Sequence, residues 1–112
     1  DVCFGSYGCN PVGLQDKMEA TDILRMAEAF QSKVVIPIHW DVWTNFYADL
    51  REIEVLWEMR RNRLNYQFHP FFWKVGGSYT LPNDYSKIEY MYERGFDDCF
   101  EHSPNVPFRS VL

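Results

Sequence analysis

The hydrophobic residues of the stretch ATDILRMAEAF, residues 20–30, recur at the spacing of an α-helix. Ile23, Ala27 and Phe30 fall at positions i, i+4 and i+7, with Leu24 beside them. Thr21 precedes this stripe, and its hydroxyl can accept a hydrogen bond from a free amide at the helix start. The pattern predicts an amphipathic helix capped by Thr21.

The apolar run VVIPI, residues 34–38, predicts a strand that is buried on both faces, as parallel strands between helices are. Pro37 has no N–H group to donate, which favours the end or the edge of a sheet. A short strand is also predicted at DVCF, residues 1–4, and a loop at the glycine-rich stretch GSYGCNPVG, residues 5–13. The order strand, loop, helix, strand predicts a right-handed βαβ-like unit of an α/β fold.

The second half of the chain predicts a helix, a hairpin and a tail. Residues 49–64, DLREIEVLWEMRRNRL, carry a helical apolar stripe, and Asp49 with Glu52 forms a D-x-x-E capping pattern. Residues 66–82 predict two strands joined at Gly76-Gly77, since glycine supplies the positive φ of a tight hairpin. Residues 83–112 have turn signals and weak periodicity, which predict an extended C-terminal tail.

Composition adds two expectations. Aromatic residues make up 18% of the 112 residues, a heavy share for a short chain, so we expect another segment or subunit to cover some of them. The net charge of −5 and the single basic run RRNR, residues 60–63, argue against a nucleic-acid partner.

The three cysteines are Cys3, Cys9 and Cys99. An odd count with no visible signal peptide predicts a reducing, cytoplasmic compartment and no disulfide framework. No apolar run reaches the roughly 18 residues of a membrane span, so no membrane partner is expected.

His39 is the strongest candidate for chemistry, because it directly follows the predicted strand 34–38 and sites gather at the carboxyl ends of such strands. If the strand geometry continues, Asp41 shares a face with it. Imidazole and carboxylate together suit a divalent metal. The alternative is a hydrogen-bonded structural histidine followed by a turn aspartate.

One histidine does not make a metal site, because a catalytic zinc needs about three protein ligands. Cys99 and His102 form a C-x-x-H pair that could join His39, but no CxxC pair or H-x-H-x-D cluster occurs. His69 is interpreted as a structural or exposed residue and not as a ligand. Arg94, beside two aspartates in RGFDDCF, either belongs to a salt-bridged turn or anchors an anionic substrate.

Six strings of this chain occur together in one known family: GSYG-NP-G--DKM, DILRMAEA, KVVIPIHWDVW-NF, EI-VLWEM, PF-W-VGG and ERGFDDCF. Together and in this order, they resemble the C-terminal part of the L-ascorbate-6-phosphate lactonases, which belong to the metallo-β-lactamase superfamily. The resemblance spans nearly the whole chain.

The resemblance implies that residues 1–112 are the C-terminal part of a four-layer αββα sandwich, with sandwich elements up to about residue 82 and the tail beyond. It implies a divalent metal, manganese or zinc, held mostly by residues upstream of this chain. His39 matches the family's final metal histidine through Pro37-Ile38-His39, and Asp41 would orient the site without binding the metal itself.

The family's reaction is the opening of a sugar-lactone phosphate by a metal-bound hydroxide. Tyr7, Asn10 and Arg94 are candidates for substrate binding, and no catalytic residue is expected within this chain itself. The upstream half of the domain would be its partner, in a homo-oligomer.

Two positions depart from the family pattern: Cys9 stands where an acidic residue precedes the asparagine, and Trp40 where a second histidine stands. These two differences bear on the choice of substrate more than on the fold. Two alternatives remain open, a non-catalytic binding or oligomerisation module and another metal-dependent hydrolase, such as a phosphodiesterase, on the same fold.

Overall fold

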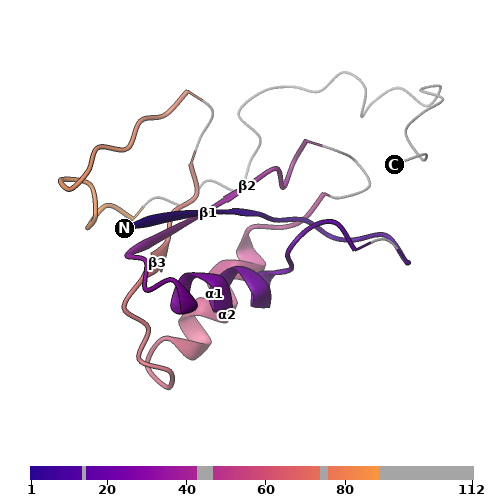
Figure 1. Ribbon diagram of the computed structural model, residues 1–112, viewed down its shortest axis with the longest axis horizontal. Helices are drawn as coiled ribbons and strands as arrows, with labels where there is room; N and C mark the ends of the chain where they lie inside the picture. Colours follow the sequence, from indigo (N-terminus) through magenta and orange to yellow (C-terminus); the bar gives the residue numbers. More distant parts are fainter. Residues whose placement is uncertain (14, 43–46, 74–75, 89–112) are drawn as a thin grey trace.

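The computed structural model describes residues 1–13, 15–42, 47–73 and 76–88 (Figure 1). Their helices and strands, in chain order, are β1 (Val2–Ser6), α1 (Ala20–Ala29), β2 (Val34–Ile38), α2 (Arg51–Arg60) and β3 (His69–Pro70). The expected mixed α/β class is confirmed. The described residues form one small sheet with two helices and do not by themselves make up a sandwich.

The three strands form a parallel sheet in the order β1-β2-β3. Val2 pairs with Val34 and Ser6 with Ile38, so β1 and β2 run in step along their full lengths. The predicted strand–loop–helix–strand unit is therefore present, and its two strands are neighbours. Because they are parallel, both carboxyl ends lie at the same edge of the sheet.

Both helices lie on one face of the sheet (Figure 1). The buried core between them includes Ile23, Leu24 and Ala27 of α1 and Ile53 and Trp57 of α2. The apolar stripe predicted for α1 thus packs inward, and so do Ile53, Leu56 and Trp57 of the stripe predicted for α2. Leu64, the last residue of that second stripe, lies beyond α2 and is 45% exposed. Only Phe30 departs from the α1 stripe, since it follows the last helical residue and is exposed.

Gly5 in β1 allows α1 to pack closely on the sheet. A Cβ atom at this position would overlap the end of the Ile23 side chain and lie 3.0 Å from Cε of Met26. Any other residue at position 5 would therefore push the helix away or displace buried side chains.

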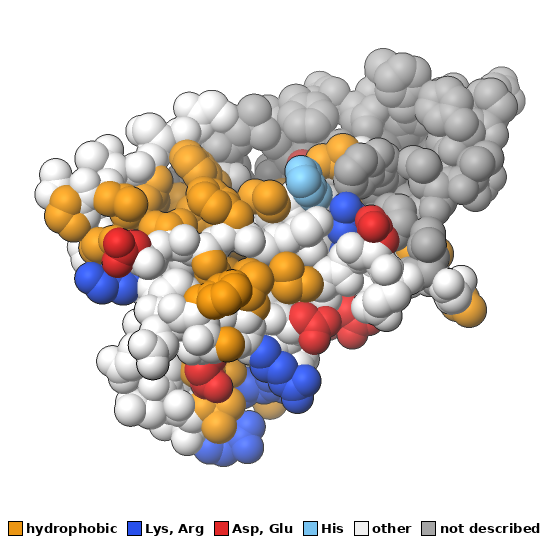
Figure 2. Space-filling model, viewed as in Figure 1, with side chains coloured by type: hydrophobic (Ala, Val, Ile, Leu, Met, Phe, Trp, Pro, Cys, Tyr) orange, Lys and Arg blue, Asp and Glu red, His pale blue; other side chains and the backbone are white. Residues whose placement is uncertain are grey.

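The opposite face of the sheet carries no helix among the described residues, and we call it the helix-free face. It consists of side chains that alternate with those facing the helices: Val2, Phe4, Val34, Ile36 and Ile38. Trp73, Tyr79 and Tyr85 cover it only in part. Phe4 remains 52% exposed although its ring stacks on Trp73 with centroids 6.4 Å apart. Figure 2 shows hydrophobic side chains gathered on the surface of the molecule.

The start of α1 differs from the prediction. Glu19, not Thr21, is the N-cap, and it forms a capping box with Asp22. The Asp22 carboxylate accepts a hydrogen bond from the Glu19 N–H at 3.2 Å. The reciprocal use of two acidic side chains satisfies the amides that we expected Thr21 to cap.

Helix α2 is shorter than the predicted 49–64, and it ends at Arg60, followed by turns through Asn65. Its N-cap is Leu50, without a side-chain cap. The Asp49 carboxylate instead accepts hydrogen bonds from the Arg51 N–H at 2.9 Å and from its guanidinium at 2.8 Å. These contacts lower the pKa of Asp49 below its ordinary value.

The predicted hairpin at residues 66–82 is wrong. His69–Pro70 forms a two-residue strand that pairs with β2, and no strand occurs in the described residues 76–88. Gly76 does adopt positive φ, at 80°. His69–Pro70 pairs with β2 because the edge of β2 that faces away from β1 is otherwise unpaired. As a result, Phe71 and Phe72 lie in the core and not in a hairpin.

The predicted tail begins inside a series of turns at residues 81–86. The rest of the tail, residues 89–112, lies outside the described part, and its extended conformation stays a prediction. No described helix has the length and apolar character needed to cross a membrane.

Candidate functional site

The candidate site lies where β1 and β2 end side by side. The Tyr7 N–H donates to the Ile38 carbonyl at 2.9 Å, which ties the first residue after β1 to the last residue of β2. Met18 closes the other side of β1, since its N–H donates to the Ser6 carbonyl at 2.8 Å. The loop after β1 and the turn after β2 thus leave the sheet at the same edge, the usual location of sites in parallel α/β sheets.

His39 is exposed at this edge and has a left-handed backbone, with φ of 64°. Such a conformation is unfavourable for a residue with a Cβ, and it persists only where the surroundings enforce it. Nδ1 of His39 lies 3.4 Å from the hydroxyl of Ser6, the last residue of β1. With Nδ1 beside Ser6, Nε2 is the ring atom suited to bind a metal.

Asp41 does not continue the geometry of the strand. β2 ends at Ile38, and residues 40–42 form a turn, so the expectation of a shared face based on an unbroken strand does not hold. Asp41 is half-buried and has an interaction partner of its own. Its role as an orienter of the metal site stays a prediction.

Tyr7 is almost fully buried, at 1% exposed, and its hydroxyl points to the start of α2. It donates to the Asp49 carbonyl at 2.8 Å and lies 3.4 Å from Oε2 of Glu52. Burial, followed by the negative charge of Glu52, raises the pKa of Tyr7 well above its ordinary value. The phenol therefore stays neutral and anchors α2 to the loop; its proposed contact with substrate stays a prediction.

Asn10 organises the loop that follows Tyr7. Its Oδ1 accepts hydrogen bonds from the N–H groups of Asp16 and Lys17, at 2.9 and 2.8 Å. Its Nδ2 donates to the Lys17 carbonyl at 2.8 Å. The Asn10 side chain thus holds the backbone of residues 16–17 in place, which is a structural role. Its proposed contact with substrate stays a prediction.

A small cavity of about 160 Å³ adjoins this loop. Its lining comes from the loop after β1 and the starts of both helices, and consists of Tyr7, Gly8, Cys9, Glu19, Ala20, Ala48 and Glu52. Cys9 is exposed and is a free thiol. Two carboxylates in this lining make the cavity a poor place for an anion.

The described residues do not form a complete metal site. Within ranges 1–13, 15–42, 47–73 and 76–88, no group of three or more His, Cys, Asp or Glu side chains could hold a metal ion. His69 lies elsewhere, in β3, where its Nε2 is 2.6 Å from the Tyr85 carbonyl. Arg94, Cys99 and His102 lie outside the described residues. A metal bound by His39 would therefore need its other ligands from outside the described residues, and His39 as a metal ligand stays a prediction.

Ser6 is the site residue that sequence reasoning missed. The available signal was the register of the sheet: the residue that ends the first strand must lie beside the residue that ends the second. The predicted boundary of the first strand, at residue 4, concealed it, because β1 extends to Ser6.

Comparison with curated proteins gives strong similarity along the entire chain. The chain is 60% identical over all 112 residues to the probable L-ascorbate-6-phosphate lactonase UlaG of Salmonella gallinarum, and 60% identical to the protein of the same name from Escherichia fergusonii. The protein of that name from Salmonella newport is 59% identical. The chain spans 32% of the length of these relatives. No protein-family model matches it. The resemblance to this lactonase family is thereby confirmed.

Proposed function

We propose that this chain supplies part of a metal-dependent lactonase that hydrolyses L-ascorbate 6-phosphate. The observation that carries the proposal is the 60% identity over every residue of the chain to probable lactonases of that specificity. The chain spans about a third of their length, so the activity is proposed for the whole protein and not for residues 1–112 alone.

His39 is the proposed metal ligand of this chain. It lies at the carboxyl edge of the parallel sheet, it is exposed, and its Nδ1 faces Ser6. When bound, a divalent metal, manganese or zinc, would activate water for attack on the lactone carbonyl and polarise the carbonyl oxygen. The residues of this chain would hold one coordination position and shape the adjoining loop.

The loop after β1 is the proposed substrate-facing segment, with Tyr7 and Asn10 as its fixed points. Tyr7 anchors it to α2 and Asn10 anchors it to residues 16–17. A loop restrained in this way can place backbone groups against a substrate at little entropic cost. Arg94 is proposed to pair with the phosphate of the substrate.

The proposed partner of the helix-free face is the upstream part of the same protein. Parallel sheets are covered on both faces in α/β proteins. Here one face has helices, while Phe4 on the other is about half exposed. The incomplete cover of this face agrees with a sandwich in which a second sheet packs there. Further copies of the whole protein would then assemble into a homo-oligomer.

The free thiols of Cys3 and Cys9 support a reducing, cytoplasmic location.

The test is a chimera in which this chain replaces the 112 residues that it matches in the Salmonella gallinarum relative. The chimera is expected to bind manganese or zinc and to open the lactone. His39→Ala should remove both metal and turnover. His69→Gln is the matched control, because it removes an imidazole from β3, away from the site edge, and should leave metal content unchanged.

Two other outcomes would point to the remaining functions. A folded chimera that holds metal and hydrolyses phosphodiesters, but not the lactone, would favour another hydrolase on the same fold. A folded chimera without metal would favour a non-catalytic binding module. Either result would overturn the proposed lactonase.

A further inference from the structure

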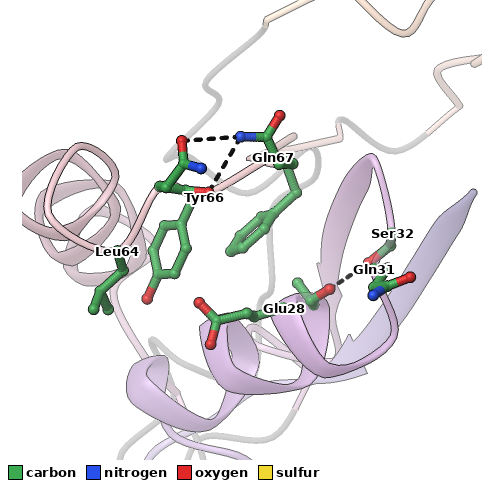
Figure 3. Close-up of a pocket in the computed structure, with 9 residues that line it drawn as sticks. Glu28, Gln31, Ser32, Leu64, Tyr66 and Gln67 are labelled. Atoms are coloured by element: carbon green, nitrogen blue, oxygen red, sulfur yellow. Dashed lines mark hydrogen bonds between the residues drawn. The ribbon is translucent and has the colours of Figure 1, made fainter.

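A cavity of about 500 Å³ lies between the end of α1 and the chain that follows α2 (Figure 3). Its lining comes from these two segments and consists of Ala27, Glu28, Gln31, Ser32, Leu64, Asn65, Tyr66, Gln67 and Phe68. Ser32 lies just before β2 and His39 just after it, so the cavity is at the end of the strand opposite to His39. The volume is in the range of pockets that enclose small organic molecules.

The walls of the cavity are two helix ends. Gln31, just after α1, and Asn65, the last residue of the turns that follow α2, both have positive φ, 52° and 51°. The Ser32 N–H donates to the Ala27 carbonyl at 3.2 Å, and the Tyr66 N–H donates to the Arg61 carbonyl at 2.9 Å. Both reversals are the usual way for a helix to end. The two reversals satisfy the Ala27 and Arg61 carbonyls and bring the segments that line the cavity to its walls.

Aromatic side chains form one side of the cavity. The rings of Tyr66 and Phe68 contact each other with centroids 4.6 Å apart. The indole N–H of Trp57 donates to the Phe68 carbonyl at 2.9 Å, which fixes the backbone that carries them. Leu64 adds an apolar wall that is 45% exposed. The π-faces of such rings are negative and attract cations.

Glu28 faces these rings from α1. Figure 3 shows the Glu28 carboxylate and the Tyr66 ring extending from the two segments toward the same space. The last turn of α1 holds no basic residue. The nearby Arg61 is engaged elsewhere, 3.2 Å from the Glu58 carboxylate and over the Trp57 ring. No ion pair of Glu28 occurs within the described part of the chain.

The amides at the rim are bound to each other. The Gln67 side-chain amide donates to the carbonyl of Asn65 at 3.2 Å and to its side-chain oxygen at 3.1 Å (Figure 3). These contacts use donor groups that an anionic ligand would need. The Glu28 carboxylate and the Tyr66 ring remain to meet a ligand, and both favour positive charge.

We propose that this cavity binds a small organic cation, an alkylammonium compound whose charged group lies between the Glu28 carboxylate and the Tyr66 ring and whose apolar part contacts Leu64 and Phe68. The proposal does not depend on the lactonase assignment, because no residue of the cavity belongs to the edge that carries His39.

The test measures the binding of choline to the full-length protein, by calorimetry or by NMR of labelled protein. The neutral carbon isostere 3,3-dimethylbutan-1-ol has the same shape without the charge. Choline is expected to bind and the isostere to bind at least about tenfold more weakly, the effect of losing one charge-assisted contact. Equal binding of the two would show an apolar pocket and overturn the proposal, as would no binding of choline.

Two variants assign binding to the cavity. Glu28→Gln should weaken choline about tenfold, and Tyr66→Leu, which keeps apolar bulk but removes the π-face, should also weaken it. Asp16→Asn is the matched control, since it removes an exposed carboxylate of the loop after β1, at the other end of the sheet from the cavity. Unchanged affinity in Glu28→Gln, with native thermal unfolding, would overturn the proposal. Lactone turnover is not part of this readout, so the two proposals fail separately.

Discussion

The Ser6 hydroxyl lies 3.4 Å from Nδ1 of His39, at the edge where β1 and β2 end together. The contact joins residues 33 positions apart in the sequence, and it follows from the register that pairs Ser6 with Ile38. His39 is held there with a left-handed backbone. Its imidazole is therefore placed by the neighbouring strand as well as by its own.

Removal of the Ser6 hydroxyl should weaken metal binding through His39. Residues that hydrogen-bond a metal-binding histidine commonly contribute 10- to 100-fold in metal affinity. The contact of Ser6 is exposed and long, at 3.4 Å, so Ser6→Ala should lower the affinity about tenfold, the low end of this range. Ser6→Thr keeps the hydroxyl and should restore most of the affinity. Competition with a metal-binding dye, measured on the chimera, gives the constants. Equal affinity in all three proteins would show that Ser6 does not position His39.

Substitution of Gly5 should destabilise the packing of α1 on the sheet. Gly5→Ala places a methyl group against Ile23 and Met26 in the core, at an expected cost of about 1–3 kcal/mol in the free energy of unfolding. Urea denaturation of the chimera measures this cost. Ser78→Ala, at an exposed position, serves as the control. A Gly5→Ala protein as stable as its parent would mean that α1 packs less closely than described.

The sequence predicted much of the fold because its signals are local. A single segment shows each of these signals by itself: the helical stripe of Ile23, Leu24 and Ala27 in α1, and the run of branched residues at β2. The hairpin at residues 66–82 failed for the opposite reason: pairing of His69–Pro70 with β2 is a contact between distant segments. A glycine pair indicates where a chain can reverse, but not which strand it will pair with.

The candidate site was only partly predictable. His39 could be found because it follows a buried strand directly. The break in the strand at His39 itself, which removes Asp41 from the expected geometry, needed backbone angles. The buried hydroxyl of Tyr7 and its contact with Asp49 needed the packing of α2 against the loop, which no local pattern encodes.

Loss of the Tyr7 hydroxyl should destabilise the protein below about pH 10. Tyr7→Phe leaves the Asp49 carbonyl without its donor, at an expected cost of about 1–2 kcal/mol. Because the pKa of Tyr7 is raised in the folded state, its stabilising effect is complete below the ordinary tyrosine pKa near 10 and is lost as the pH rises further.

Denaturation of the chimera at several pH values between 8 and 11 (about the tyrosine range) tests this effect. The parent protein should lose stability at the upper end, and Tyr7→Phe should lose less. Tyr79, whose pKa is also raised by burial, will keep some pH dependence in the variant. If the free energy of unfolding depends on pH equally in the two proteins, the Tyr7 phenol is exposed to water and not buried.

The helix-free face should make the isolated chain associate. Residues 1–112 alone are expected to self-associate or aggregate, because the helix-free face is covered only in part and Phe4 is 52% exposed. Phe4→Lys should reduce this association in sedimentation velocity and should also weaken assembly with the upstream part of the relative, supplied as a separate polypeptide. Phe30→Lys, at a 70% exposed position beyond α1, should change neither. A monomeric parent chain at high concentration would contradict this assignment.

The most direct test of the central claim is the turnover of L-ascorbate 6-phosphate by the chimera with the Salmonella gallinarum relative, beside residues 1–112 alone. The chimera is expected to open the lactone, a chelator to abolish the reaction, and the chain alone to show no turnover. A folded, metal-loaded chimera without lactonase activity would contradict the proposed function, as would chelator-sensitive turnover by residues 1–112 alone.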